Sequence, residues 1–214
     1  MGNNKFDLKD RYGLITGGAG FLGKYHALAL LECGADIILT DYNEELLELA
    51  KKEIRSQYPK KNIYSYVMDV TDESSVRSVS SVCKTNNIRV DILINNAAID
   101  AKVSKKDGLT NTSRLEGFQL QEWNRQLAVG LTGAFICSKV FGYEMSLNGG
   151  GVILNIASDL SVIAPDQRLY GDVSVEESSR AVKPVTYSVI KHGLIGLTKY
   201  LATYWPEKNV RCNA

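Results

Sequence analysis

The residues best suited to chemistry in this chain are a tyrosine and a lysine four positions apart, Tyr187 and Lys191. Residues at this spacing on a helix share one face, so the two side chains would lie side by side. A neighbouring ammonium favours the phenolate, which lets a tyrosine exchange a proton at physiological pH. Pairs of this kind are also common on helix surfaces, so the assignment depends on the rest of the chain.

A glycine-rich turn near the N-terminus has the pattern of a dinucleotide-binding loop. The sequence predicts a buried strand over residues 12–16, a tight loop over 17–23 and a helix over 24–33. Glycines let the backbone approach a pyrophosphate, whose charge is met by free amides and by the positive end of the helix. The spacing is matched both by Gly18, Gly20 and Gly23 and by Gly17, Gly20 and Gly23. A glycine turn without a ligand is the alternative.

An acidic residue, Asp41, follows the second predicted strand at residues 35–40 and lies 18 residues after Gly23. At about this spacing a carboxylate reaches the adenosine ribose of NAD. It would repel the 2′-phosphate of NADP, and no lysine or arginine lies within the loop or directly after Asp41. The sequence therefore favours NAD. The alternative is that Asp41 caps the helix that follows it.

Four motifs in fixed order resemble the short-chain dehydrogenase/reductase family over residues 8–214. They are residues 16–23 (TGGAGFLG), Asp69 with Val70 after the third strand, residues 95–98 (NNAA) after the fourth, and Ser158 with Tyr187 and Lys191. The resemblance implies that Ser158 binds the substrate oxygen, that Tyr187 exchanges its proton, and that Lys191 holds the nicotinamide ribose and lowers the pKa of the tyrosine. It also implies a homodimer or homotetramer.

The resemblance further implies where the cofactor binds. Asp69 and Val70 would lie against the adenine, and Asn96 and Ala97 near the ribose. The full set implied for NAD(H) is Thr16, Gly17, Gly20, Phe21, Leu22, Gly23, Asp41, Asp69, Val70, Asn96, Ala97, Ala98, Tyr187 and Lys191.

Three features depart from the family's pattern. Phe21 stands where compact members have their middle glycine, as in the larger, sugar-nucleotide-modifying branch. Gly130 stands where the family has an asparagine whose main-chain carbonyl helps to hold a proton-relay water, so that relay is in doubt. The chain ends after a sixth strand at residues 209–212, before the helix that covers the substrate in other members. We therefore expect the residues that close over the substrate to lie outside this sequence.

Strands and helices alternate along the chain. This pattern predicts an α/β fold, a doubly wound parallel sheet of the Rossmann type with helices on both faces, in a single domain over residues 1–214. The expected strands cover residues 12–16, 35–40, 63–68, 90–94, 152–156 and 209–212, and the main helices cover 24–33, 73–85, 120–147 and 185–205. Ligands of such sheets bind at the carboxyl ends of the strands, where all the motifs lie.

The composition argues against several other functions. The chain has 25 basic and 24 acidic residues, a net charge of +1, which gives no reason to expect nucleic acid or an anionic membrane as a partner. Four cysteines and two histidines show no paired metal-ligand spacing, so we expect no metal site. No secretory or membrane-spanning apolar run is present, and we expect a cytoplasmic protein.

Substrate identity should lie in two loops that are longer than the family's norm, residues 98–123 and the segment between Ser158 and Tyr187. Residues 164–170 (APDQRLY) suit a polyhydroxylated or anionic substrate and resemble flagellin modification protein A-like oxidoreductases of surface-glycan pathways. We predict that residues 163–183 form a lid and that Arg168 contacts the substrate. A polar loop that contacts solvent or other subunits is the alternative.

These patterns together predict an enzyme, an NAD-dependent alcohol dehydrogenase or carbonyl reductase acting on a sugar-derived small molecule. A nucleotide-sugar epimerase or dehydratase with retained NAD would use the same tyrosine and lysine. A non-catalytic NAD-binding regulator is the alternative outside the enzymes, and Gly130 makes it conceivable.

Overall fold

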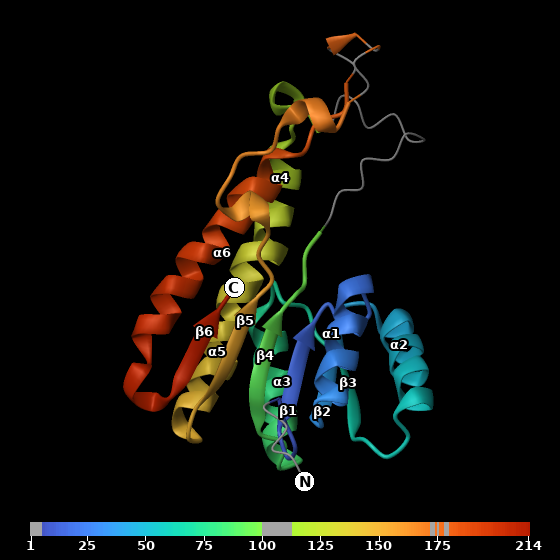
Figure 1. The fold of residues 1–214 in the computed structure, drawn as a ribbon, viewed down its shortest axis with the longest axis vertical. Helices are drawn as coiled ribbons and strands as arrows, with labels where there is room; N and C mark the ends of the chain where they lie inside the picture. Colours follow the sequence, from blue (N-terminus) through green and yellow to red (C-terminus); the bar gives the residue numbers. More distant parts are fainter. Residues whose placement is uncertain (1–5, 100–112, 172–173, 175, 178–179) are drawn as a thin grey trace.

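The computed structural model describes residues 6–99, 113–171, 174, 176–177 and 180–214, in which helices surround a six-stranded parallel sheet (Figure 1). The strands are β1 (Tyr12–Thr16), β2 (Asp36–Asp41), β3 (Ile63–Val67), β4 (Val90–Asn95), β5 (Gly151–Asn155) and β6 (Val210–Asn213). The helices are α1 (Phe21–Glu32), α2 (Glu44–Gln57), α3 (Glu73–Thr85), α4 (Leu120–Leu127), α5 (Gly133–Leu147) and α6 (Val185–Tyr204). The strand order is β3-β2-β1-β4-β5-β6, which confirms the predicted doubly wound sheet.

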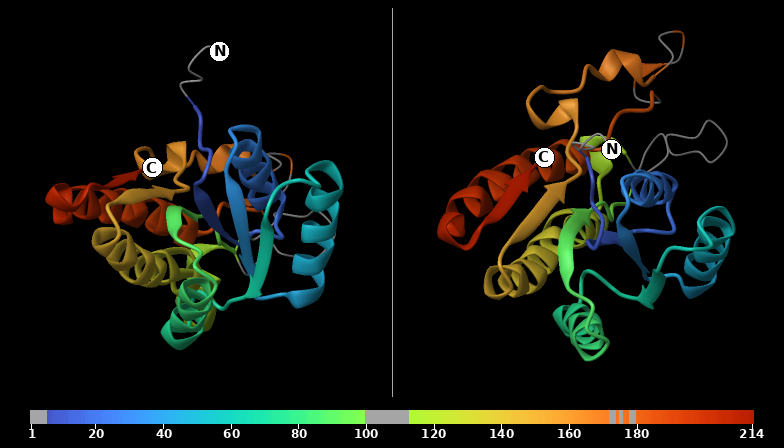
Figure 2. Two further views of the ribbon diagram at one scale, coloured as in Figure 1. Left: turned by 90° about the horizontal axis from the view of Figure 1, so that it is seen from below. Right: turned by 60° about the horizontal axis from the view of Figure 1, so that its bottom comes forward.

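Each face of the sheet carries its own apolar core, because successive side chains of a strand point to opposite faces. Leu14 of β1 packs into a core shared with Val76 of α3 and Phe141 of α5. Its neighbour Ile15 packs into a second core with Leu47 of α2. Figure 2 shows the two sets of helices on either side of the strands. Burial on both faces explains why the central strands read as continuous apolar runs.

The strand order reverses between β1 and β4, since the chain runs outward from β1 through β2 to β3 and then crosses back to β4. Open sheets bind ligands at such a switch point, beyond the carboxyl ends of the strands. The predicted glycine turn follows β1, and residues 95–98 begin at the last residue of β4. The sheet therefore brings these two motifs together.

The helix predicted over residues 120–147 is confirmed over its whole length, with a π-helical turn inside it. The π-helical turn Ala128–Thr132 separates α4 from α5. Such a turn widens the helix by one residue, and it occurs frequently at functional sites. A Cβ at Gly130, inside this turn, would lie 2.9 Å from Cγ2 of Ile190 in α6. The close approach of α6 occupies the space that a side chain at position 130 would need.

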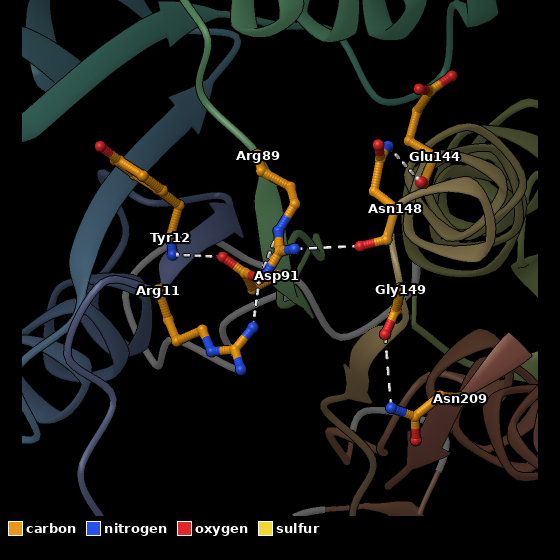
Figure 3. Close-up of polar contacts among 8 residues, drawn as sticks. All are labelled: Arg11, Tyr12, Arg89, Asp91, Glu144, Asn148, Gly149 and Asn209. Carbon is orange, nitrogen blue, oxygen red and sulfur yellow. Dashed lines mark hydrogen bonds and ion pairs between the residues drawn. The ribbon is translucent and has the colours of Figure 1, made fainter.

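A buried carboxylate, Asp91, organises the opposite end of the sheet (Figure 3). Asp91 is 3% exposed and accepts hydrogen bonds from Nη1 of Arg11 at 2.9 Å, from the Tyr12 amide at 3.0 Å and from Nε of Arg89 at 2.9 Å. Arg89 also donates to the Asn148 carbonyl at 3.0 Å. The network connects β1, β4 and the turn before β5, at the edge away from the glycine turn.

Candidate active site

Thr16 and Asn96 join the two loops at the switch point. The Thr16 hydroxyl accepts hydrogen bonds from the amides of Asn96 and Ala97, each at 3.0 Å. The Asn96 side-chain amide donates in return to the carbonyls of Thr16 at 2.9 Å and Gly17 at 3.1 Å. Gly17 has φ +62°, and a Cβ there would lie 3.0 Å from the Ala97 backbone. A glycine is needed at this position because both the left-handed backbone and the close approach exclude a side chain.

The glycine turn leads directly into α1. A Cβ at Gly23 would lie 2.2 Å from the Gly17 carbonyl oxygen, so the turn can close only around a glycine. The first turn of α1 has no acidic residue, and its N-cap residue, Gly20, supplies no side-chain hydrogen bond. The first turn of α1 therefore supplies no carboxylate or side-chain cap of its own to the positive end of the helix dipole. In this turn Phe21 is 74% exposed and Leu22 is 50% exposed.

Asp41 lies at the carboxyl end of β2 and contacts the glycine turn. Its Oδ2 accepts a hydrogen bond from the Ala19 amide at 3.2 Å, and its Oδ1 accepts one from the Asn43 amide at 3.2 Å. The cap of α2 is Asn43, whose side chain accepts from the Leu46 amide at 2.9 Å. The alternative role of Asp41 as the helix cap is therefore wrong.

Asp69 and Val70 follow β3 and face in different directions. Asp69 is exposed, and its Oδ1 accepts hydrogen bonds from the Thr71 amide at 2.8 Å and the Thr71 hydroxyl at 2.7 Å. Val70 is 8% exposed, and a Cβ at Gly133 would lie 2.7 Å from its Cγ2. Val70 thus packs against the start of α5, while the Asp69 carboxylate stays at the surface of the sheet edge.

Ser158 caps the short 3-10 turn Asp159–Ser161 just after β5. Its hydroxyl donates to Oδ1 of Asp159 at 2.7 Å and accepts from the Leu160 amide at 3.2 Å. The hydrogen bond from Ser158 is the main cause that lowers the pKa of Asp159 below its ordinary value. The turn packs against α6, which holds the serine close to the helix that carries the tyrosine and the lysine.

Tyr187 and Lys191 lie one turn apart in α6, as the spacing predicted. Lys191 is 8% exposed, and its ammonium donates to the Ile156 carbonyl just beyond β5. The ammonium lies 5.6 Å from the centroid of the Tyr187 ring. A second lysine, Lys183, lies closer, with its Nζ 3.8 Å from the same centroid. Lys183 was not predicted from the sequence, because it precedes α6 and helical spacing does not relate it to Tyr187.

A buried polar chain fixes the start of α6. Thr186 is fully buried and donates its hydroxyl proton to Oε1 of Gln126 in α4. Gln126 is 4% exposed and donates to Oε1 of Glu122 at 2.7 Å. The hydrogen bond from Arg125 is the main cause that lowers the pKa of Glu122. This link between α4 and the residue before Tyr187 was not found from the sequence, because its members are 60 positions apart.

His26 of α1 packs beside the residues that join the two loops. Its Nε2 is buried and has no hydrogen-bond partner among the residues that the structure describes. Burial lowers the pKa of His26 from its ordinary value of 6.5, and the neighbouring Asn96 side chain opposes the shift. A titratable group therefore contacts the asparagine that ties the glycine turn to β4.

Arg168 faces solvent in the short turn Gln167–Leu169. Its side chain is 85% exposed and forms an ion pair with Asp166, with Nε 2.8 Å from Oδ1 and Nη2 2.6 Å from Oδ2. The hydrogen bonds from Arg168 lower the pKa of Asp166 to about 2. Several residues of the predicted lid, 172–173, 175 and 178–179, lie outside the described residues, as do residues 100–112 of the other long loop.

A cleft of about 430 Å³ lies between the predicted lid and the start of α6. Val185, Ser188 and Val189 of α6 contribute to its lining. These three residues lie on a different side of the helix from Tyr187 and Lys191, because each residue turns the helix by a little more than a quarter of a circle. The lid segment therefore also borders a space outside the tyrosine–lysine face.

In the part of the chain that the structure describes, no group of three or more histidine, cysteine, aspartate or glutamate side chains could hold a metal ion. None of the helices in this part of the chain combines the length and the apolar character needed to cross a membrane.

A sequence profile of the short chain dehydrogenase family matches residues 12–171. The protein therefore belongs to the short chain dehydrogenase family, whose members are oxidoreductases that bind a nicotinamide cofactor. The resemblance that the four motifs carried is confirmed.

Curated relatives cover nearly the whole of this chain. A short chain dehydrogenase/reductase of Gibberella zeae is 34% identical over 204 residues, 94% of this chain and 66% of that protein. The NAD-dependent glycerol dehydrogenase of Listeria innocua is 27% identical over 98% of this chain and 70% of its own. The 2-dehydro-3-deoxy-D-gluconate 5-dehydrogenase of Bacillus subtilis is 30% identical over 99% of this chain and 72% of its own length. The chain thus spans about two thirds of the length of these relatives.

Solved structures agree on the fold and differ in cofactor. A gluconate 5-dehydrogenase from Burkholderia cenocepacia, in complex with NADP and tartrate, is 26% identical with a TM-score of 0.78 over 96% of this chain and 69% of that one. An NAD+-bound xylitol dehydrogenase is 29% identical, with a TM-score of 0.77, over 97% of this chain and 68% of that one. Family membership therefore leaves the choice between NAD and NADP to the residues of this chain.

Proposed function

We propose that this chain belongs to an NAD-dependent oxidoreductase that interconverts an alcohol and a carbonyl on a sugar-derived substrate. The observation that carries the proposal is the position of Lys191. It is a buried lysine beside Tyr187, bonded to the end of β5 and next to the turn that Ser158 caps. Burying an ammonium costs free energy even when it is hydrogen-bonded, so a buried lysine beside a tyrosine is a candidate functional residue.

The residues of the glycine turn fit a dinucleotide. The space that a Cβ at Gly17 or Gly23 would fill is the space through which the backbone can approach a pyrophosphate. The amides at the start of α1 would then meet its negative charge. A bound nicotinamide supplies the hydride acceptor or donor.

The protein's own residues would supply binding and proton transfer. Ser158 would turn its hydroxyl from Asp159 to the substrate oxygen and hold that oxygen against Tyr187. In the oxidation direction Tyr187 would accept the proton of the substrate hydroxyl as the hydride leaves the carbon, and in reduction it would return a proton to the oxygen. Lys191 would stabilise the phenolate and hold the nicotinamide ribose, with its stem fixed by burial.

NAD rather than NADP is supported by Asp41. Its carboxylate borders the glycine turn through the Ala19 amide, where it would bind ribose hydroxyls and repel a 2′-phosphate.

A sugar-derived substrate is supported by the names of the relatives, which include a glycerol dehydrogenase and a gluconate-derivative dehydrogenase. We also propose that the substrate belongs to surface-glycan biosynthesis, and this part of the proposal is supported by residues 164–170 alone. We further propose a cytoplasmic homo-oligomer. Exposed aromatic residues of α5 and α6, among them Phe135, Tyr143 and Tyr200, support contact with a second copy.

A non-catalytic NAD-binding regulator is the second candidate, because Gly130 keeps a main-chain carbonyl but lacks the asparagine side chain that the family has at the relay position. Binding and turnover separate the two. Purified natural protein mixed with NADH should change the cofactor's fluorescence, and a panel of keto-sugars should then be reduced. Binding without turnover of any carbonyl would replace the enzyme with the regulator.

A further inference from the structure

Lys183 lies directly against the ring of Tyr187. Its Nζ is 3.8 Å from the ring centroid, compared with 5.6 Å for Lys191. At 3.8 Å the ammonium must lie over the face of the ring, because in the ring plane it would overlap the ring edge. The negative face of an aromatic ring attracts a cation in this geometry.

The backbone of Lys183 is held in place on both sides. Its amide donates to Oε1 of Gln167 at 2.8 Å, and Nε2 of Gln167 donates back to its carbonyl at 3.4 Å. On the other side it is followed by buried Pro184, which fixes the entry into α6. The root of the side chain is therefore positioned, while its four-carbon stem lets the ammonium move by a few ångströms.

Lys183 is the cation best placed to meet a substrate. A substrate that exchanges a proton with Tyr187 must touch that side chain, so its neighbouring groups come within reach of a lysine lying on the ring. Lys191 lies deeper and donates to the Ile156 carbonyl. Arg168, the cation expected from the sequence, faces solvent, with its side chain 85% exposed.

One negative charge acts in the opposite direction. Asp159 is exposed and accepts from the Ser158 hydroxyl, so it lies near the expected position of the substrate oxygen. It would disfavour an anionic group beside Ser158. An anionic group of the substrate must therefore lie on the Lys183 side of Tyr187, away from the reacting carbon.

We propose that Lys183 forms a subsite for a carboxylate of the substrate, so that the site takes sugar acids in preference to neutral polyols. This inference rests on the proposed function and names the substrate class for it. Lys183 would bind the carboxylate by a charge-assisted hydrogen bond and keep the reacting hydroxyl or carbonyl at Tyr187.

The test uses two substrates that differ in one group. D-gluconate carries a carboxylate where D-glucitol carries a primary alcohol. With the full natural protein and NAD, kcat/KM for D-gluconate should exceed that for D-glucitol by about tenfold or more. Lys183→Met should remove this preference through KM, and Lys183→Arg should keep most of it.

Two further variants sharpen the result. Lys199→Met removes the same charge from the exposed part of α6, three turns beyond Tyr187, and should leave the preference unchanged. If Arg168→Gln rather than Lys183→Met removes the preference, the carboxylate is bound by Arg168 and the subsite at Lys183 is overturned. A wild type that favours D-glucitol also overturns it.

A binding measurement separates this inference from the proposed function. Tyr187→Phe keeps the ring face on which Lys183 lies but removes the reacting hydroxyl. Calorimetry of D-gluconate binding to the NADH complex of this variant should show affinity that falls about tenfold when Lys183→Met is added. If D-gluconate binding depends on Lys183 but the wild type turns over no substrate, the proposed oxidoreductase function is wrong and the carboxylate subsite still stands. No binding, or binding that ignores Lys183, would overturn the subsite whether or not the wild type is active.

Discussion

The Ala19 amide donates to the Asp41 carboxylate across 3.2 Å, which ties the acidic end of β2 to the glycine turn. We predict that Asp41→Ser narrows the preference for NADH over NADPH by about tenfold, since one repulsive charge interaction of about 1.4 kcal/mol is removed. The preference is measured as the ratio of the dissociation constants of NADPH and NADH, each obtained from cofactor fluorescence. Asp36→Ser, at the other end of the same strand, is the control and should keep the preference. A wild type that binds both cofactors equally would show that Asp41 does not select between them.

A methyl group at Gly23 should break the turn that leads into α1. Its Cβ would meet the Gly17 carbonyl oxygen at 2.2 Å, and both atoms belong to the backbone. Gly23→Ala should therefore cost about 2 kcal/mol of unfolding free energy and weaken NADH binding. Gly196→Ala is the matched control, because nothing lies within 4 Å of its Cβ, and it should be neutral or stabilising. Urea unfolding of both variants measures the two losses of unfolding free energy. If Gly23→Ala is as stable as Gly196→Ala, the clash with the Gly17 carbonyl does not limit the turn.

Gln126 should act on Tyr187 through Thr186. Gln126→Ala leaves a buried hydroxyl without an acceptor, so we expect a loss of about 1–3 kcal/mol in stability. We also expect a lower kcat with unchanged NADH affinity, because the first turn of α6 loosens. The double variant Gln126→Leu, Thr186→Val removes both polar groups and should recover much of the stability. If the double variant is less stable than Gln126→Ala, the hydrogen bond is not the cause of the loss.

His26 should make stability depend on pH. Burial lowers its pKa in the folded protein from the ordinary value of 6.5. As the pH falls below about 6.5, the unfolded chain gains a proton that the folded chain does not yet bind, so the free energy of unfolding falls until the lowered folded pKa is reached. His26→Gln should flatten the curve in this window. Denaturant titrations between pH 5 and 8 measure the effect, and a wild-type curve that matches His26→Gln would refute it.

The sequence predicted the fold because its signals are local and agree with one another. The strand at residues 12–16 and the helix at residues 73–85 were predicted with their observed bounds, and the bounds of the other strands differ by at most one residue. The first helix begins three residues earlier than predicted, at Phe21. The π-helical turn Ala128–Thr132 was not predicted, because no local pattern in the sequence distinguishes it from the α-helix on either side. The close approach of Ile190 to Gly130 was not predicted either, because the two residues are far apart in the chain.

In the candidate site, too, local patterns predicted some features and contacts between distant residues were missed. The spacing placed Tyr187 and Lys191 on one helix turn, and the strand ends placed Asp41 beside the glycine turn. Contacts such as that between Gln126 and Thr186 join residues far apart in the chain, so no periodic pattern in the sequence predicts them. Arg168 was predicted to contact the substrate from its residue type and its place in the loop. The structure instead shows Arg168 exposed to solvent and places Lys183 against the Tyr187 ring.

The most direct test of the proposed chemistry is Tyr187→Phe in the full natural protein, assayed for turnover and for NADH binding. The phenol hydroxyl is needed to transfer the proton, while the ring alone keeps the packing at the start of α6. We predict that kcat/KM falls by about a hundredfold or more while the dissociation constant of NADH stays within about twofold of wild type. Substantial turnover by the purified variant would contradict the assignment of Tyr187 as the proton donor and acceptor.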